Sequence, residues 1–128
     1  MKFTTVLATA AAVTAAAAAP AAPSPGERAY QKCYSCHALE PGKNDLTGPS
    51  LHGIVGRPVA AVPGFRYSPA LKRFARTHSR WTRGLIDRYA ADPEALVPGT
   101  SMTFHGVGDA RERKALLDYL SGMSKRRR

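Results

Sequence analysis

The feature that most constrains the fold is Cys33-Tyr34-Ser35-Cys36-His37, a CxxCH pattern that contains both cysteines of the 128-residue chain. Two thiols one helical turn apart can each add to a vinyl group on the same edge of a porphyrin. The histidine that follows then lies beneath the iron and can offer a ring nitrogen as an axial ligand. Because CxxCH is the attachment pattern of c-type haem, the motif predicts one covalently bound haem c with an iron atom.

Other chemistries fit the cysteine spacing less well. A thioredoxin-like redox pair would open a helix after a strand in a βαβ unit, and no such unit is predicted here. A zinc site needs further nitrogen or sulfur ligands at short spacing, whereas His52, His78 and His105 are scattered singly. A disulfide between cysteines this close would close almost no loop and would add little stability. Haem attachment is the favoured interpretation, with the redox pair and half of a zinc site as alternatives.

A candidate second axial ligand lies in Pro98-Gly99-Thr100-Ser101-Met102. The thioether of Met102 is a soft ligand, and a Met/His ligand pair raises the reduction potential of a haem. With protein ligands on both sides, the iron would have no open position for oxygen or peroxide. His105 is the rival ligand. Met102 could instead be a core methionine, although Met123, in an expected helix, fits that role better.

The N-terminus predicts a secretory signal peptide. One early lysine, an Ala-rich apolar run and small residues near a candidate cleavage site are the signs of such a leader. We therefore expect a signal peptide at 1–22, a single domain at 23–124 and a basic tail at 125–128, with the mature protein in the periplasm. An uncleaved membrane anchor is the alternative, but its length and hydrophobicity are marginal.

The body is predicted to be all-α, with long loops. Capping residues and apolar spacing predict a helix from Pro25 towards Cys33 and another from Ala70 to about Arg76. A third should follow Thr82 and end at Asp92-Pro93, and a terminal helix should run from Asp109 to near Gly122. Residues 41–64 and 93–108 read as loops. Loops of this length would be poorly ordered without a cofactor to pack against.

The chain is strongly basic. Its formal net charge is +10, from 19 Lys and Arg against 9 Asp and Glu. A charge of this size attracts acidic proteins, anionic membranes and nucleic acid without distinguishing among them. A structural or nucleic-acid-binding role would leave CxxCH and PGTSM unexplained, so we expect no nucleic-acid partner.

Taken together, several ordered motifs resemble those of the soluble monohaem (class I) cytochromes c of mitochondria and the bacterial periplasm. The resemblance covers about 26–123 and includes GERAYQKCYSCH (26–37), TGPSLHGIVGR (47–57), PGFRYSPAL (63–71) and PGTSMTF (98–104). It implies a small cytochrome c fold wrapped around one covalent haem. It also implies thioether bonds at Cys33 and Cys36 and axial ligands at His37 and Met102.

The resemblance implies further roles around the haem. The carbonyl of Pro49 would accept a hydrogen bond from the axial histidine, and Phe104 would shield the exposed haem edge. The haem propionates would be bound by Arg57, Tyr67 and Trp81, while Tyr89 and Thr100 would lie beside the ligand methionine and a propionate. Contacts between the first and last helices would come from Gly26, Tyr30 and Tyr119, although plain core packing is our favoured interpretation for the two tyrosines.

The chain also departs from the family. The segment between Tyr67 and Trp81 is about three residues longer than usual in the family and carries Lys72, Arg73, Arg76 and Arg80. Ser101 stands where the family often has a lysine, whereas Lys32 matches a common docking lysine.

The implied function is electron transport in a respiratory chain, by a monomer that is not an enzyme. We expect the haem edge near Phe104 to be ringed by positive charge and to meet redox proteins with acidic docking surfaces, such as a membrane cytochrome complex, a terminal oxidase or a reductase. Attraction to an anionic membrane is a further expectation. A dedicated electron-transfer subunit of a periplasmic dehydrogenase or reductase is the first alternative. A haem sensor or peroxidase with a labile Met102 is the second.

Overall fold

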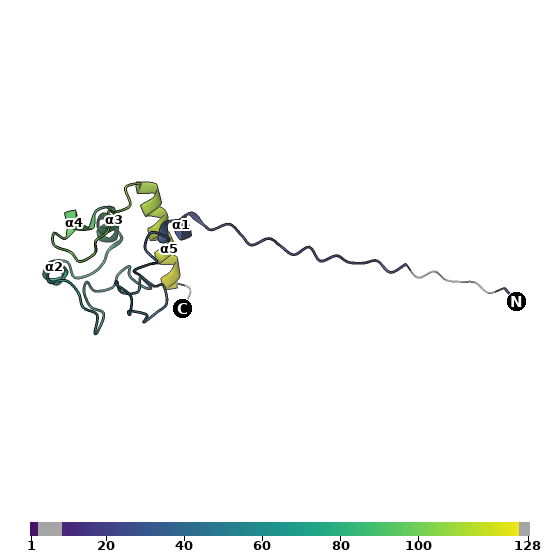
Figure 1. Ribbon diagram of the computed structural model, residues 1–128, viewed down its shortest axis with the longest axis horizontal. Helices are drawn as coiled ribbons and strands as arrows, with labels where there is room; N and C mark the ends of the chain where they lie inside the picture. The colour runs from purple at the N-terminus through teal and green to yellow at the C-terminus, as the bar shows by residue number, and fades with distance from the viewer. Residues whose placement is uncertain (3–8, 126–128) are drawn as a thin grey trace.

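The computed structural model describes residues 1–2 and 9–125. These residues form α1 (Pro25–Tyr30), α2 (Pro69–Phe74), α3 (Arg83–Ala91), α4 (Pro93–Leu96) and α5 (Ala110–Lys125). No strand is present in this part of the chain, and its β structure is limited to an isolated antiparallel bridge between Pro58 and Arg80. The expectation of an all-α fold with long loops is therefore confirmed. In Figure 1, α1 and α5 cross at one end of the body and α2 lies at the other.

The start of α1 follows the sequence prediction. The Ser24 side chain accepts a hydrogen bond from the Glu27 backbone, the Glu27 side chain accepts one from the Ser24 backbone, and Pro25 opens the helix. This reciprocal pair satisfies two of the amide groups that a helix N-terminus leaves free. However, α1 ends at Tyr30 instead of running to Cys33. Beyond it, the amides of 31–33 bond to carbonyls only three residues back, which is the tighter 3₁₀ pattern common at helix ends.

The first and last helices pack closely because a glycine lies at their crossing. A Cβ atom at Gly26 would come within 2.4 Å of the Tyr119 Cβ and 2.7 Å of the Ala115 carbonyl oxygen. Next to this crossing, the core between α1, α3 and α5 contains Ala29, Ile86, Leu116, Leu117 and Leu120, all at most 9% exposed. This core fixes the segment that follows α1.

The segment after α3 differs from the expected loop. Thr82 caps α3 as predicted, and α3 ends at Ala91. Asp92 then caps a short helix, with its Oδ1 accepting from the Ala95 amide at 3.0 Å and Pro93 in the first position. The expectation that 93–108 is entirely loop is wrong, because aspartate followed by proline starts a helix as readily as it ends one.

Backbone hydrogen bonds join the residues before α2 to those after it in a short antiparallel ladder. The Gly56 amide donates to the Trp81 carbonyl at 2.7 Å, the Trp81 amide to Arg57 at 2.8 Å, and the Val59 amide to Ser79 at 3.1 Å. The α2 helix between them starts at Pro69, capped by Ser68, and gives way to a turn after Phe74, slightly earlier than expected. The ladder holds Trp81 in the core, where it is 7% exposed.

The terminal helix is longer than predicted. It continues through Gly122 to Lys125, and Gly122 does not adopt the positive φ that would end a helix. A glycine inside a helix costs only about 1 kcal/mol relative to alanine, which surrounding contacts can offset. The predicted tail lies mostly outside the described residues, as does part of the predicted leader. No helix among the described residues is long and apolar enough to cross a bilayer.

Candidate functional site

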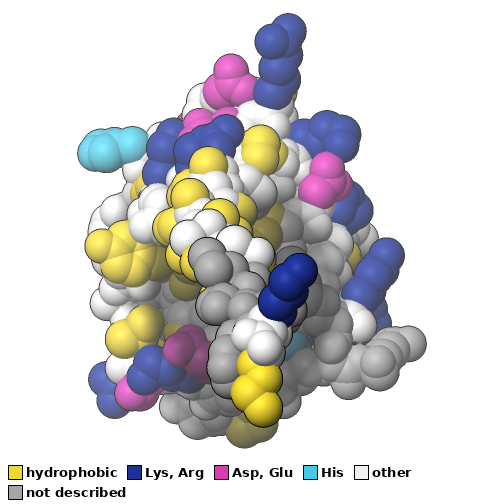
Figure 2. Space-filling model, turned by 90° about the vertical axis from the view of Figure 1, so that its right-hand side faces the viewer, with side chains coloured by type: hydrophobic (Ala, Val, Ile, Leu, Met, Phe, Trp, Pro, Cys, Tyr) yellow, Lys and Arg dark blue, Asp and Glu magenta, His cyan; other side chains and the backbone are white. Residues whose placement is uncertain are grey.

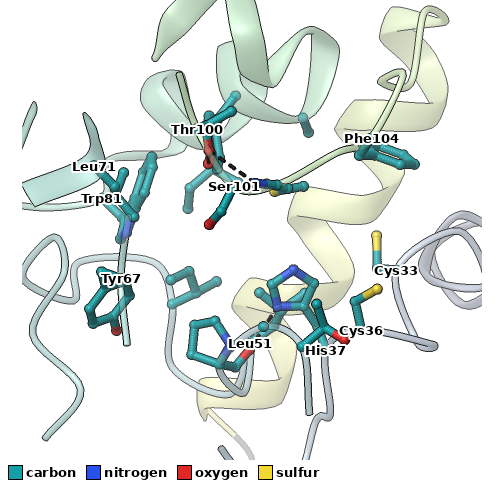
Figure 3. Close-up of a pocket in the computed structure, with 18 of the residues that line it drawn as sticks. Cys33, Cys36, His37, Leu51, Tyr67, Leu71, Trp81, Thr100, Ser101 and Phe104 are labelled. Atoms are coloured by element: carbon teal, nitrogen blue, oxygen red, sulfur yellow. Dashed lines mark hydrogen bonds between the residues drawn. The ribbon is translucent and has the colours of Figure 1, made fainter. Parts of the chain in front are cut away.

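The helices and loops surround a cavity of about 340 Å³, within the ~300–1,000 Å³ typical of ligand pockets. Figure 3 shows it between two walls, with Cys33 and Cys36 on one side and Tyr67, Leu71 and Trp81 on the other. All eleven predicted site residues line it. Apolar residues that were not predicted also line it, among them Leu51, Ile54, Phe65, Leu71, Ile86, Leu116 and Leu120.

The CxxCH segment forms one helix-like turn on one wall of the cavity. The His37 amide donates to the Cys33 carbonyl at 2.9 Å, and the Cys36 amide donates to the same oxygen at 3.1 Å. This turn places both thiols on the same side of the cavity (Figure 3), and the two cysteines form no disulfide. Burial raises the pKa of the Cys33 thiol to about 11, with the neighbouring Cys36 as a smaller cause.

The His37 ring is held in one orientation by its surroundings. Its Nδ1 lies 2.7 Å from the Pro49 carbonyl oxygen, which accepts the ring N–H. Burial is the main cause that lowers the pKa of His37, partly offset by the Pro49 bond, so the ring is neutral at pH 7. A neutral ring that donates from Nδ1 has its lone pair on Nε2, the atom needed for metal ligation.

Two further residues position His37. A Cβ atom at Gly48 would lie 2.2–2.8 Å from three atoms of the ring, so only glycine fits beneath it. The Tyr30 hydroxyl donates to the His37 carbonyl oxygen at 2.5 Å. This tyrosine therefore forms a hydrogen bond to the CxxCH segment in addition to the core packing that we favoured for it. Gly48 was not predicted as a site residue, although it directly precedes Pro49, which the family resemblance had placed beside the axial histidine.

Met102 lies in a loop that crosses the cavity on the side away from His37. In Figure 3, the neighbouring Thr100 and Ser101 are on the upper side of the cavity and His37 is below. The Thr100 Oγ1 accepts from the Met102 amide at 3.2 Å and lies 2.6 Å from the Tyr89 hydroxyl. Burial is the main cause that raises the pKa of Tyr89, with the Thr100 bond acting against it. The rival ligand His105 is exposed and does not line the cavity.

The wall opposite the cysteines holds a half-buried cation. The Arg57 guanidinium donates to the carbonyls of Ser50, at 2.8 Å, and His52. Burial lowers its pKa, and no Asp or Glu lines the cavity. On the same wall the Tyr67 hydroxyl accepts from the Val62 amide at 3.1 Å, which leaves its proton free to donate. This wall therefore suits a ligand with carboxylates, since a buried charge needs a partner of opposite sign.

Phe104 lines the cavity, and few cations belong to that lining. Phe104 lies on the same side as the cysteines in Figure 3. Of the cavity-lining residues only Lys32 and Arg57 are cationic, and Lys32 forms a salt bridge of 2.7 Å with Glu112. The expected ring of positive charge concerns the outer surface around Phe104, so it stays a prediction.

These groups together fit the predicted cofactor. Two thiols on one turn match two attachment points on one edge of a flat ring, while His37 lies across the cavity from Thr100 and Ser101, the residues that precede Met102. Arg57 accepts a backbone hydrogen bond from Trp81, which lies on the wall opposite the thiols. A zinc site gains no support, because the described residues hold no cluster of three or more His, Cys, Asp or Glu.

Comparison with known proteins agrees with this reading. The chain is 43% identical over 90 residues to the Ascaris suum protein named cytochrome c type-1, covering 70% of this chain and 77% of that one. It is 40% identical over 95 residues to cytochrome c2 of Blastochloris viridis, covering 74% and 72%. Among solved structures, cytochrome cH from Methylobacterium extorquens matches with a TM-score of 0.67 at 31% identity, covering 77% of this chain and 95% of that one. No family model matches the chain.

Proposed function

This chain belongs to the class I monohaem cytochromes c, and we propose that His37 and Met102 are the axial ligands through which it carries single electrons. Its function is electron transfer, and its cofactor is one covalently attached haem c. When bound, the haem would supply an iron that can accept and donate single electrons. The observation that carries the ligand proposal is the convergence of His37 Nε2 and Met102 on one apolar cavity beside both thiols.

The chain's own residues account for the rest of the site. Cys33 and Cys36 supply the thioether sulfurs, and Pro49 fixes the His37 ring. Thr100 holds the backbone of Met102, while the apolar side chains exclude water from the cavity. Arg57, Tyr67 and Trp81 form the wall that would receive the propionates.

The visible spectrum of the holoprotein tests the ligand set. The oxidised protein should show the charge-transfer band of a thioether–iron bond, and Met102→Ala should abolish it. Met123→Ala, in α5, is the matched control and should leave the band unchanged. An identical spectrum in Met102→Ala and the wild type would remove Met102 from the site, and a colourless protein with two free thiols would remove the haem.

The carrier proposal and the peroxidase or sensor alternative differ in how easily Met102 leaves the iron. A carrier keeps both axial positions filled. The Thr100 bond to the Met102 amide supports a fixed ligand. The reduced wild-type protein should therefore bind carbon monoxide poorly at pH 7, whereas rapid and tight binding would favour a sensor or peroxidase.

We further propose that the mature protein is a periplasmic monomer that meets acidic surfaces of redox proteins. The basic composition and the predicted leader support this placement. N-terminal sequencing of the protein from a periplasmic fraction should find the mature chain starting after about residue 19 or 22, and sedimentation should give one chain per particle. A retained leader in the membrane fraction would contradict the proposal.

A further inference from the structure

The charges of this chain are unevenly distributed along its sequence. Between Asp45 and Asp87 there is no acidic residue, yet residues 46–86 contain seven Lys and Arg. They therefore account for +7 of the +10 total, and the rest of the chain, with twelve Lys and Arg and nine Asp and Glu, accounts for +3. Of these seven cations, Arg83 pairs with Asp118, and the other six form no salt bridge with a described residue.

Four of the cations in this segment form what we call the α2 basic face: Lys72, Arg73, Arg76 and Arg80. All four are exposed. The salt bridges between described residues involve other cations and none of these. Of the four side chains, only that of Arg80 forms a hydrogen bond within the described residues, to the Gly56 carbonyl at 2.8 Å.

The fold brings these cations to one end of the body. The Phe74 and His78 rings stack at 3.9 Å, and Phe74 lies 6.1 Å from Trp81 between ring centroids. These contacts fold the connection after α2 back against the helix. Lys72 and Arg73 are in α2, whereas Arg76 and Arg80 follow its end at Phe74. Like charges gathered within 72–80 repel one another, and a negatively charged partner would relieve this repulsion.

The other end of the body has a different charge pattern. Figure 2 views the molecule from the side of α1 and α5, where acidic side chains are interspersed with basic ones. There Lys32 pairs with Glu112, and Arg83 and Lys114 both pair with Asp118. Charge on this side is largely balanced within the chain.

The α2 basic face lies behind the cavity wall that is opposite the cysteines. Leu71 and Ser68 line the cavity, whereas Lys72 and Arg73, next in sequence to Leu71, are exposed. In Figure 3, Leu71 and Trp81 are across the cavity from Cys33 and Cys36. A partner on this face would be about one helix diameter, roughly 10–12 Å, from the cavity, and would leave the opening beside Phe104 free.

From these observations we propose that the α2 basic face is the docking site for a carboxylate-rich protein surface, separate from the opening beside Phe104. The proposal rests on the electron-transfer function and names the surface that its partner uses. Three of the four cations are arginines, whose planar guanidinium groups pair with carboxylates in a bidentate manner. An anionic membrane fits less well, because interfacial binding usually needs an apolar face, and the large exposed hydrophobic residues among those described are Met1, Val13 and Tyr34, all outside α2.

The test compares two holoprotein variants with the same change of charge. Lys72→Gln/Arg73→Gln/Arg76→Gln removes three charges from the α2 basic face. Arg88→Gln/Arg111→Gln/Lys114→Gln removes three exposed charges elsewhere. Binding is followed by amide NMR shifts of the reduced protein at low salt, with poly-L-glutamate as the probe and phosphatidylglycerol-containing vesicles in a parallel arm.

We expect poly-L-glutamate to shift amides within 66–80. Loss of three exposed charge pairs should weaken its binding about tenfold in the α2 variant, with a much smaller change in the control variant. Three results would each overturn the proposal: equal weakening in both variants, the largest amide shifts at 33–36 and 101–104, or no binding of poly-L-glutamate. Vesicles that bind through 66–80 when poly-L-glutamate does not would replace it with a membrane site. An intact haem spectrum and reduction by ascorbate in every protein separate these outcomes from a failure of the electron-transfer function.

Discussion

The Nδ1 atom of His37 lies 2.7 Å from the carbonyl oxygen of Pro49, and Gly48 lies so close to the same ring that a Cβ atom there would be 2.2–2.8 Å from three ring atoms. Two neighbouring residues therefore hold the ring from different directions, one by a hydrogen bond and the other by close contact. A ring held in this way presents Nε2 to the cavity before any metal is bound. The orientation of the predicted ligand is thus a property of the chain itself.

Gly48→Ala should disturb this arrangement. The new methyl group would lie 2.2–2.8 Å from three ring atoms, and relief of such overpacking typically costs about 1–3 kcal/mol. We expect a lower yield of haem-bearing protein and a lower denaturation midpoint. Gly84→Ala is the control, because its nearest atom would be the Thr82 Oγ1 at 3.9 Å. Equal yields and midpoints in the two variants would show that the ring does not need the glycine.

Thr100→Val should loosen the Met102 loop. The substitution removes the acceptor for the Met102 amide and the partner of the Tyr89 hydroxyl, and leaving such buried groups unpaired costs about 1–3 kcal/mol. The thioether–iron band should disappear at a lower temperature or denaturant concentration than in the wild type. Thr103→Val, at an exposed position in the same loop, should not shift this transition. A Thr100→Val protein that keeps the wild-type transition would contradict the assigned role.

Tyr89 should make stability depend on alkaline pH. Burial raises its pKa above the ordinary value of 10.0, so the folded state favours the neutral phenol. Its contribution is fully present below the unfolded pKa of about 10 and is lost as pH rises through the folded pKa. Denaturation of the wild type should therefore become easier above pH ~10 more steeply than that of Tyr89→Phe. Parallel pH profiles for the two proteins would rule out this contribution.

Two glycines should respond in opposite ways to alanine. Gly26→Ala would bring a Cβ within 2.4 Å of Tyr119 at the crossing of α1 and α5, so we expect a loss of about 1–3 kcal/mol. Gly122→Ala meets no atom within 4 Å and lies inside α5, so it should gain up to ~1 kcal/mol. Chemical denaturation of both variants checks the signs. Destabilisation by Gly122→Ala would mean that the end of α5 is not helical in solution.

Local patterns in the sequence predicted local structure well. Thr82 caps a helix as expected, and Ser24 and Ser68 cap helices in the same way, because a cap depends only on side chains within three residues of it. Asp92 was interpreted only as a helix end, since the same residue types also start helices. The end of α5 was placed too early for a similar reason: a glycine ends a helix only where the backbone takes a positive φ, and tertiary contacts decide that.

The haem chemistry could be predicted from the sequence, because CxxCH places two thiols and an imidazole within five consecutive residues. The pairing of charges was decided by tertiary structure. Lys32 and Glu112 are 80 residues apart, and the crossing of α1 and α5 brings them into a salt bridge. Likewise, the cations of the α2 basic face form no salt bridge with a described residue, because the fold places the acidic residues elsewhere. Long-range pairing depends on packing between distant segments, and no local pattern records it.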